Sequence, residues 1–122
     1  MKFFYSLLLF ALLTFLACNR NPKVDYQQLV GELCTCSLKI YEQNQIFEKA
    51  LQDKKQERAI SLMDTLAITE NKYRACIQSL QEKYKFFNDK NYLKDVEKVA
   101  KIQCLDKMPI IMKELSDERW SK

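Results

Sequence analysis

Apolar residues return every three or four positions through most of the chain, which is the spacing of a helix that buries one face. The first such stripe starts after Asp25, and Gln28 three positions later completes a capping-box pattern that is typical of a helix start. The stripe lapses over residues 51–57, where Asp53 and Gln56 repeat the capping pattern. We therefore predict that a first helix ends there and a second begins. The apolar positions of the first stripe are Tyr26, Leu29, Val30, Leu33, Cys34, Cys36, Ile40, Tyr41 and Phe47.

Two further stripes predict a second and a third helix, separated by the polar turn signal Asn88–Asn91. Pro109 falls inside the third stripe. Because proline lacks a backbone N–H and clashes with the preceding turn, we expect a kink or break close to Met108. The second stripe contains Ala59, Leu62, Leu66, Tyr73, Cys76, Leu80, Tyr84 and Phe87, and the third contains Leu93, Val96, Ala100, Cys104, Met108, Ile111 and Leu115.

The composition supports a helical domain. Hydrophobic residues make up 48% of the 122 positions and charged residues 30%, while a single Gly and two Pro leave few turns for a β-rich fold. We predict an all-α domain over residues 24–115, an up-down-up antiparallel three-helix bundle whose third helix is kinked or broken near Pro109. Residues 116–122 are expected to form a polar tail.

The N-terminal stretch has a different pattern. Lys2 precedes an apolar run of 15 residues, Phe3 to Ala17. A membrane-spanning helix needs about 20, so this run has the length of a signal-peptide core. Phe15-Leu16-Ala17-Cys18 resembles the lipobox of bacterial lipoproteins, in which the cysteine is acylated and becomes the mature N-terminus. We expect a lipoprotein signal peptide at 1–17, a palmitate-type lipid on Cys18 and a tether at 18–23. The alternative is an unlipidated secretory signal.

Five cysteines are present, and setting Cys18 aside leaves an even set that predicts two disulfides in an exported chain: Cys34, Cys36, Cys76 and Cys104. Residues equidistant from the turn of an antiparallel hairpin lie at the same height. The midpoint of Cys36 and Cys76 is position 56 and that of Cys34 and Cys76 is position 55, both in the first predicted turn. The midpoint of Cys76 and Cys104 is position 90, in the second. Cys34 and Cys36 point about 200° apart on a helix. We therefore expect Cys76 and Cys104 to pair with one each, in an order that the spacing leaves open.

A resemblance follows from the same residues. The pattern Glu32-Leu33-Cys34-Thr35-Cys36, then Ala75-Cys76 with Lys83-Tyr84 after it, then a last cysteine at Cys104, is similar to a set of small exported proteins and lipoproteins of the Bacteroidota. In that set a proline often follows the last cysteine directly, whereas Pro109 comes five residues later here. The resemblance implies an exported helical domain with a C-x-C…C…C framework, and it implies no particular activity.

The residues that several kinds of catalytic and ligand-binding site require are absent from the sequence or nearly so. The chain has no histidine, which excludes histidine-based catalysis and histidine metal sites, and one glycine excludes glycine-rich phosphate loops. We predict a non-enzyme without catalytic residues, cofactor or metal. The alternative is a thiol–disulfide or metal-handling protein, because C-x-C can act as a dithiol. That protein would use Cys34, Cys36, Cys76 and Cys104. The methionines Met63, Met108 and Met112 are expected to fill gaps in the core.

Charge and location complete the expectations. Asp95 and Glu97 interleave with a row of lysines on the third predicted helix, and without Lys2 the chain has 19 basic against 16 acidic residues. We therefore expect a solvated face and no nucleic-acid partner; the alternative for this row is contact with anionic lipid or polysaccharide. The aromatic stretch Tyr84–Tyr92 should seal one end of the bundle. We expect a lipid-anchored accessory or protein-binding module of the cell envelope, on the outer membrane, with its domain in the periplasm or at the cell surface and an envelope protein as partner. The lysine row is Lys90, Lys94, Lys98 and Lys101.

Overall fold

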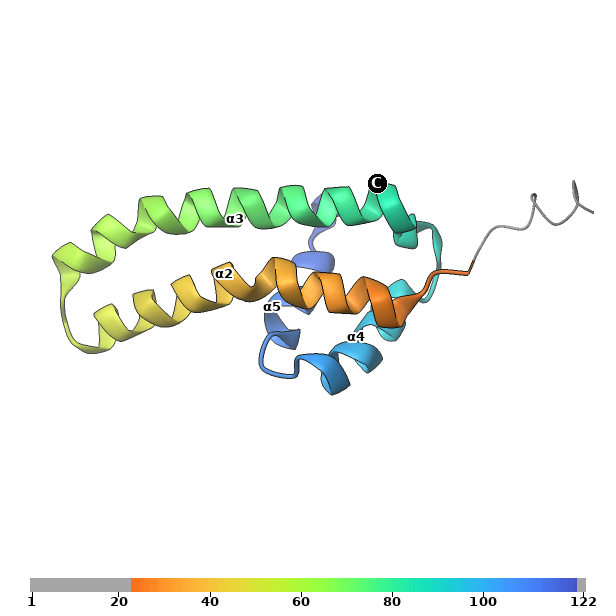
Figure 1. The fold of residues 1–122 in the computed structure, drawn as a ribbon. Coiled ribbons are helices and arrows are strands. Elements are labelled where there is room, and N and C mark those ends of the chain that lie inside the picture. Colours follow the sequence, from red (N-terminus) through yellow and green to blue (C-terminus); the bar gives the residue numbers. More distant parts are fainter. Residues whose placement is uncertain (1–22, 121–122) are drawn as a thin grey trace, which may run out of the picture.

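The computed structural model describes residues 23–120, which contain helices and no strand. Two long antiparallel helices, α2 (Tyr26–Gln52) and α3 (Gln56–Tyr84), form a hairpin (Figure 1). The shorter helices α4 (Tyr92–Gln103) and α5 (Met108–Leu115) pack against α2 near the open end of the hairpin. Short 3₁₀ turns occupy Phe86–Asn88 and Glu118–Trp120. The predicted all-α class is confirmed.

The predicted signal peptide, Cys18 and most of the predicted tether lie outside the described residues. Within residues 23–120, no helix combines the length and the apolar character needed to cross a membrane.

The start of α2 agrees with the capping prediction, and the turn to α3 does not. The Asp25 side chain accepts a hydrogen bond from the backbone N–H of Gln28 at 3.2 Å. Asp53, predicted to cap the second helix, instead ends α2, while the residue before α3, Lys55, makes no side-chain cap bond. The N–H of Lys54 bonds to Leu51 O and that of Lys55 to Ala50 O, the paired bonds that close a helix C-terminus.

The third predicted helix is two helices. Residues 104–107 separate α4 from α5 directly before Met108, where a kink or break was expected, so the described residues form four helices in place of an up-down-up set of three. The break precedes Met108, and Pro109 lies in the first turn of α5. A proline is well tolerated there because the N–H groups of a first turn have no partner within the helix. Pro109 therefore marks the start of a new helix.

The hydrophobic core fills the open half of the hairpin, between α2, α3, α4 and α5. The predicted stripes supply most of it, but Ile77 and Phe86 are fully buried although no stripe included them. Phe86 reaches the core from the 3₁₀ turn after α3, which periodicity cannot anticipate. The core consists of Leu29, Val30, Leu33, Ile40, Tyr73, Ile77, Leu80, Phe86, Val96, Val99, Ala100, Cys104, Ile111 and Leu115.

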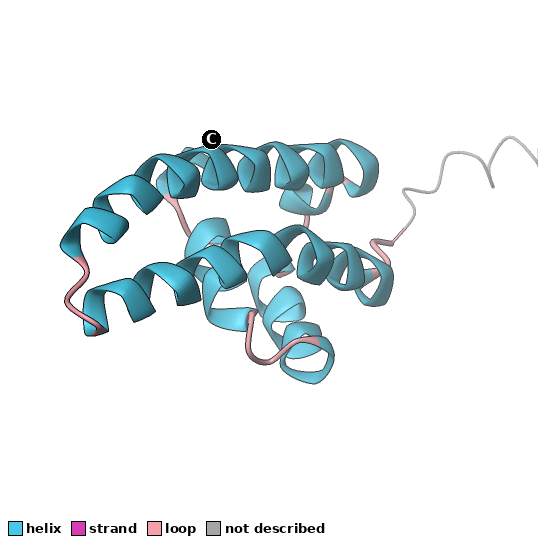
Figure 2. Ribbon diagram, turned by 60° about the vertical axis from the view of Figure 1, so that its left-hand side comes forward, coloured by secondary structure: helices cyan, strands magenta, loops and turns pink. Residues whose placement is uncertain are grey.

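The rest of the hairpin, residues 44–68, is called the arm here. Figures 1 and 2 show it extending beyond α4 and α5 to the turn at residues 53–55. Within the arm only Ala50 and Ala59 are buried, each 4% exposed. Both are small, so the arm buries much less apolar side chain than the open half of the hairpin does.

Candidate functional site

Two disulfides join three helices at one level of the domain. Cys34 pairs with Cys104, with Cα atoms 6.1 Å apart, and Cys36 pairs with Cys76 at 6.0 Å. The disulfide bonds expected from the cysteine count are therefore present, and the structure supplies the order that the spacing left open. Both Cα distances lie within the usual range of disulfides. The C-x-C pair of α2 thus holds α3 on one side and the end of α4 on the other.

Two of the three methionines expected to fill gaps in the core do contact it, and the third does not. Met108 and Met112 pack against the core, whereas Met63 is 57% exposed on the arm and fills no core gap. Among residues 23–120, no group of three or more His, Cys, Asp or Glu side chains is arranged to hold a metal ion.

Glu32, Lys83 and Tyr84, which carry part of the Bacteroidota-type pattern, meet in space. The Lys83 ammonium lies 2.9 Å from Glu32 Oε1, and the Tyr84 hydroxyl donates to Glu32 Oε2. These two donors, Tyr84 first, hold the pKa of the Glu32 carboxyl below its ordinary value. The contact joins the open ends of α2 and α3, and the midpoints of these positions fall close to the first turn, so the height rule used for the cysteines could have found it.

A pocket of about 840 Å³ opens beside this cluster, at the end of the domain where the described chain begins. On its wall the Tyr26 hydroxyl donates to Asp89 Oδ2 at 2.6 Å, and the Asn91 N–H donates to Asp89 Oδ1 at 3.1 Å. Burial and the hydrogen bond to Asp89 raise the pKa of Tyr26. The hydrogen bond from Tyr26 lowers the pKa of Asp89. The lining residues are Lys23, Val24, Tyr26, Gln27, Lys83, Tyr84, Lys85, Asn88, Asp89, Asp95, Lys98 and Val99.

The predicted lysine row does not act as one surface. Lys98 lines the pocket, while Lys101 forms an ion pair with Glu97 at 3.2 Å, one turn earlier on α4. Lys90 lies in the turn before α4, and both it and Lys94 are exposed.

The aromatic stretch closes the same end of the domain. Phe86 contacts Phe87 with ring centroids 4.5 Å apart and Tyr92 at 5.8 Å. Trp120 lies 5.5 Å from Phe87, so residues beyond Leu115 that were expected to form a polar tail contribute to the packing. The cluster ties the turn between α3 and α4 to the C-terminal residues.

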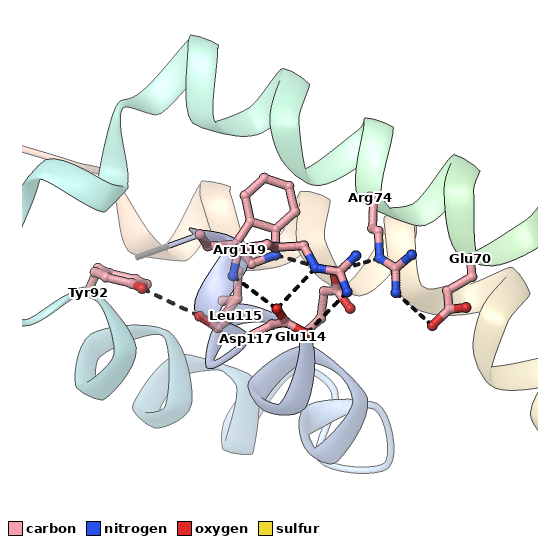
Figure 3. A network of polar contacts seen from close by, with 8 residues as sticks. Glu70, Arg74, Tyr92, Glu114, Leu115, Asp117 and Arg119 are labelled. Atoms are coloured by element: carbon pink, nitrogen blue, oxygen red, sulfur yellow. Dashed lines mark hydrogen bonds and ion pairs between the residues drawn. The ribbon is translucent and has the colours of Figure 1, made fainter. Parts of the chain in front are cut away.

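Figure 3 shows a polar network between α3 and the C-terminal residues that no sequence pattern predicted. Glu114 on α5 is only 9% exposed, and its Oε1 accepts from Arg74 Nε at 3.1 Å and from Trp120 Nε1 at 3.2 Å. Arg74 also donates to Glu70 at 2.9 Å. Burial, and secondarily the Glu114 carboxylate, raise the pKa of Tyr73. Arg74 and Glu114 lie 40 residues apart in the sequence, so no local pattern joins them.

The arm carries exposed apolar side chains on the side of α3 from which Arg74 reaches Glu114 of α5. Arg74 reaches α5, and Ala67 and Ile60 precede it at seven-residue steps, which return a helix to nearly the same side with a drift of about 20°. Met63 lies on the same side, one turn from Ile60. Ile60 is 66% exposed, Met63 57%, and Ala67 is also exposed. These three residues, called the arm face, form an exposed apolar strip on α3, beside the face that carries its buried residues.

Comparisons with protein-family models, with curated proteins and with solved structures found no match for the chain.

Proposed function

We propose that the protein is a lipid-anchored, non-catalytic binding module of the bacterial envelope, attached through acylated Cys18 and binding a partner protein along the arm face. The observation that carries the proposal is the exposure of Ile60 and Met63 on the arm, in the half of the hairpin that extends beyond α4 and α5. Exposed apolar surface on a small soluble domain is typical of a contact site. The partner that fits is a protein presenting an amphipathic helix, which would lie along the hairpin beyond the end of α5.

The disulfides support this assignment over thiol chemistry. Each cysteine of the C-x-C pair is bonded to a different segment of the chain, Cys34 to Cys104 and Cys36 to Cys76. Such cross-links stabilise a small exported domain whose core occupies only one half of the hairpin.

The dimensions suit an anchored arm. The 29 residues of α3 span about 43 Å at 1.5 Å per residue. Residue 23 lies at the open end of the hairpin, opposite the turn at 53–55 (Figure 1). A lipid on Cys18 would therefore hold the open end near the membrane and leave the arm free to reach a protein away from it.

The test of anchoring is metabolic labelling with a radioactive or alkynyl palmitate analogue in cells that express the full chain. The label is expected on the wild-type protein and is expected to be lost in Cys18→Ser. A labelled Cys18→Ser variant, or an unlabelled wild type recovered as a soluble exported protein, overturns the lipid anchor.

The test of the arm face is site-specific photo-crosslinking in intact cells. A crosslinker at Met63 is expected to give one discrete heavier species, and a crosslinker at Thr65, exposed about 200° away on the same helix, is expected to give none. The variant Ile60→Glu is expected to abolish the Met63 product, whereas Ile68→Glu, which replaces another exposed apolar side chain, is expected to leave it intact. Equal products from Met63 and Thr65, or equal effects of the two variants, refute the proposed site.

The non-catalytic assignment has its own test. The purified acylated protein is expected to leave substrates of common envelope hydrolases unchanged, and no thiol should react with a thiol reagent before denaturation. Sustained turnover, or titratable thiols in the native protein, contradicts this part of the proposal.

A further inference from the structure

The pocket at the open end of the domain carries positive charge without partners. Lys83 is paired with Glu32, but Lys23, Lys85 and Lys98 form no ion pair with any other part of residues 23–120. An unpaired ammonium group in a pocket attracts an anionic ligand, since lysine is a compact point charge that binds phosphate well.

The acidic residues of the pocket limit what that ligand can be. Asp89 is engaged by Tyr26 and by the N–H of Asn91, and Asp95 also lines the wall. Three unpaired lysines against these two carboxylates leave a net charge of about +1, which matches the single negative charge of a phosphodiester better than a polyanion. The carboxylate of Asp95, which has no hydrogen-bond donor among residues 23–120, can accept from a hydroxyl group of the same ligand.

The position of the pocket supplies the source of the phosphodiester. Lys23, on the pocket wall, is five residues from Cys18, and a fully extended chain of that length spans at most about 18 Å. If Cys18 carries a lipid, the mouth of the pocket is confined to the layer of lipid headgroups or directly above it. The concentration of headgroups next to the pocket is then very high, as it is for any tethered pair.

We propose that this pocket binds the headgroup of an anionic phospholipid of the phosphatidylglycerol class, the phosphate between Lys23, Lys85 and Lys98 and a glycerol hydroxyl toward Asp95. The inference rests on the proposed acylation of Cys18. It adds a second membrane contact beside the lipid anchor, and two contacts fix the direction of a rod where one leaves it free to swing. Bound in this way, the open end faces the membrane and the arm points away from it.

The experiment uses the acylated full-length mature protein reconstituted into phosphatidylcholine vesicles with or without phosphatidylglycerol. A water-soluble amine reagent labels the lysines, and mass spectrometry quantifies the labelling of each. With phosphatidylglycerol present, Lys23, Lys85 and Lys98 are expected to react about fivefold more slowly, the effect expected of one lysine at an anionic membrane surface. Lys54 and Lys55, at the far turn, serve as internal controls and are expected to react at an unchanged rate.

A variant pair tests the site itself. Lys85→Asn with Lys98→Gln is expected to abolish the protection of Lys23, and asparagine suits position 85 because it tolerates the positive φ of 52° found there. The matched control Lys54→Asn with Lys55→Gln is expected to preserve that protection. A circular-dichroism melt of both variants checks that the fold is retained.

The outcomes separate the two proposals. A protein without acyl mass on Cys18 refutes the lipoprotein assignment on which this inference rests. An acylated protein whose pocket lysines react equally in both vesicle types refutes headgroup binding and leaves the lipoprotein assignment standing. If inorganic phosphate alone protects the same lysines in phosphatidylcholine vesicles, the pocket is a free-phosphate site, and the proposed lipid source is wrong.

Discussion

Removing one disulfide at a time measures how much each of the two bridges stabilises the domain. The change is the double substitution Cys36→Ala with Cys76→Ala, or Cys34→Ala with Cys104→Ala, so that no lone thiol remains to form wrong bridges. Both bridges start within two positions of one another on α2 and close nested loops, with sequence separations of 40 and 70 residues.

The expected magnitudes follow from the loops that the bridges close in the unfolded chain. Alone, the 40-residue loop corresponds to about 3.9 kcal/mol and the 70-residue loop to about 4.4 kcal/mol. When the inner bridge, Cys36–Cys76, is intact, it already closes 40 of the 70 residues between Cys34 and Cys104. The outer bridge, Cys34–Cys104, then closes a loop of only about 30 further residues, worth about 3.6 kcal/mol. By the same cycle, the inner bridge is worth about 3.1 kcal/mol when the outer one is present. Losing both should cost about 7.5 kcal/mol, a large part of the roughly 5–15 kcal/mol that stabilises a domain.

Urea denaturation followed by circular dichroism provides the measurement, with the oxidised state of each variant checked by mass. Each double-alanine variant is expected to lose about 3–4 kcal/mol in the free energy of unfolding, and its melting temperature should fall by roughly 4–8 °C per kcal/mol. The four-alanine variant is expected to be largely unfolded. A loss below about 1 kcal/mol for either pair would refute the loop-entropy reasoning, and a four-alanine variant that melts like the wild type would refute the structural role of the bridges.

Three further predictions test other parts of the fold. Lys54→Gly should raise the free energy of unfolding by about 0.5–1 kcal/mol in urea melts, because Lys54 has a φ of 56° that costs a side chain more than it costs glycine; a loss of stability would contradict the assigned turn. Arg74→Met should cost about 1–3 kcal/mol, because it leaves the carboxylate of Glu114 in the interior without its cation, and adding Glu114→Leu should recover much of that loss; additive losses in the double variant would argue against the pair. The third prediction concerns acid: the hydrogen bond from Tyr26 lowers the pKa of Asp89 in the folded state, so the stability this bond adds is complete above the ordinary aspartate pKa of about 3.9 and is lost as the pH falls through the lower folded value. The melting temperature of the wild type should therefore fall more between about pH 5 and pH 3 than that of Tyr26→Phe. Parallel curves of melting temperature against pH would contradict this linkage.

The periodicity of apolar residues predicted most of the helical secondary structure. The start of α2 at Asp25 and the turn near position 55 follow from local signals, a capping side chain and a lapse in the apolar stripe. The capping prediction at Asp53 was wrong, because an Asp followed three positions later by a Gln marks a helix start only when the helix before it has already ended. Here the paired backbone bonds from Lys54 and Lys55 end α2 and determine the turn.

The candidate sites were less predictable. The height rule placed the cysteines together because it uses only the rise of a helix and the position of a turn, and it would have placed Glu32 beside Lys83 and Tyr84 as well. It could not place Arg74 against Glu114, because α5 exists only after the chain breaks at residues 104–107 and changes direction. The pocket depends on an earlier turn, at residues 85–91, because that turn sets α4 beside α2 and the end of α3, which together form its walls.

The amino-acid sequence by itself determined the helical class, the hairpin turn, the four cysteines that share one level and the expectation of a lipid on Cys18. Periodicity, spacing and short motifs are local properties, and they survive whatever the rest of the chain does. The tertiary structure decided which cysteine pairs with which, how the two halves of the third stripe pack, and which apolar residues stay uncovered. Those outcomes depend on how α4 and α5 pack across α2, which is set by all the contacts of the hydrophobic core together. Because α4 and α5 cover the open half of the hairpin, Ile60 and Met63 on the arm stay exposed.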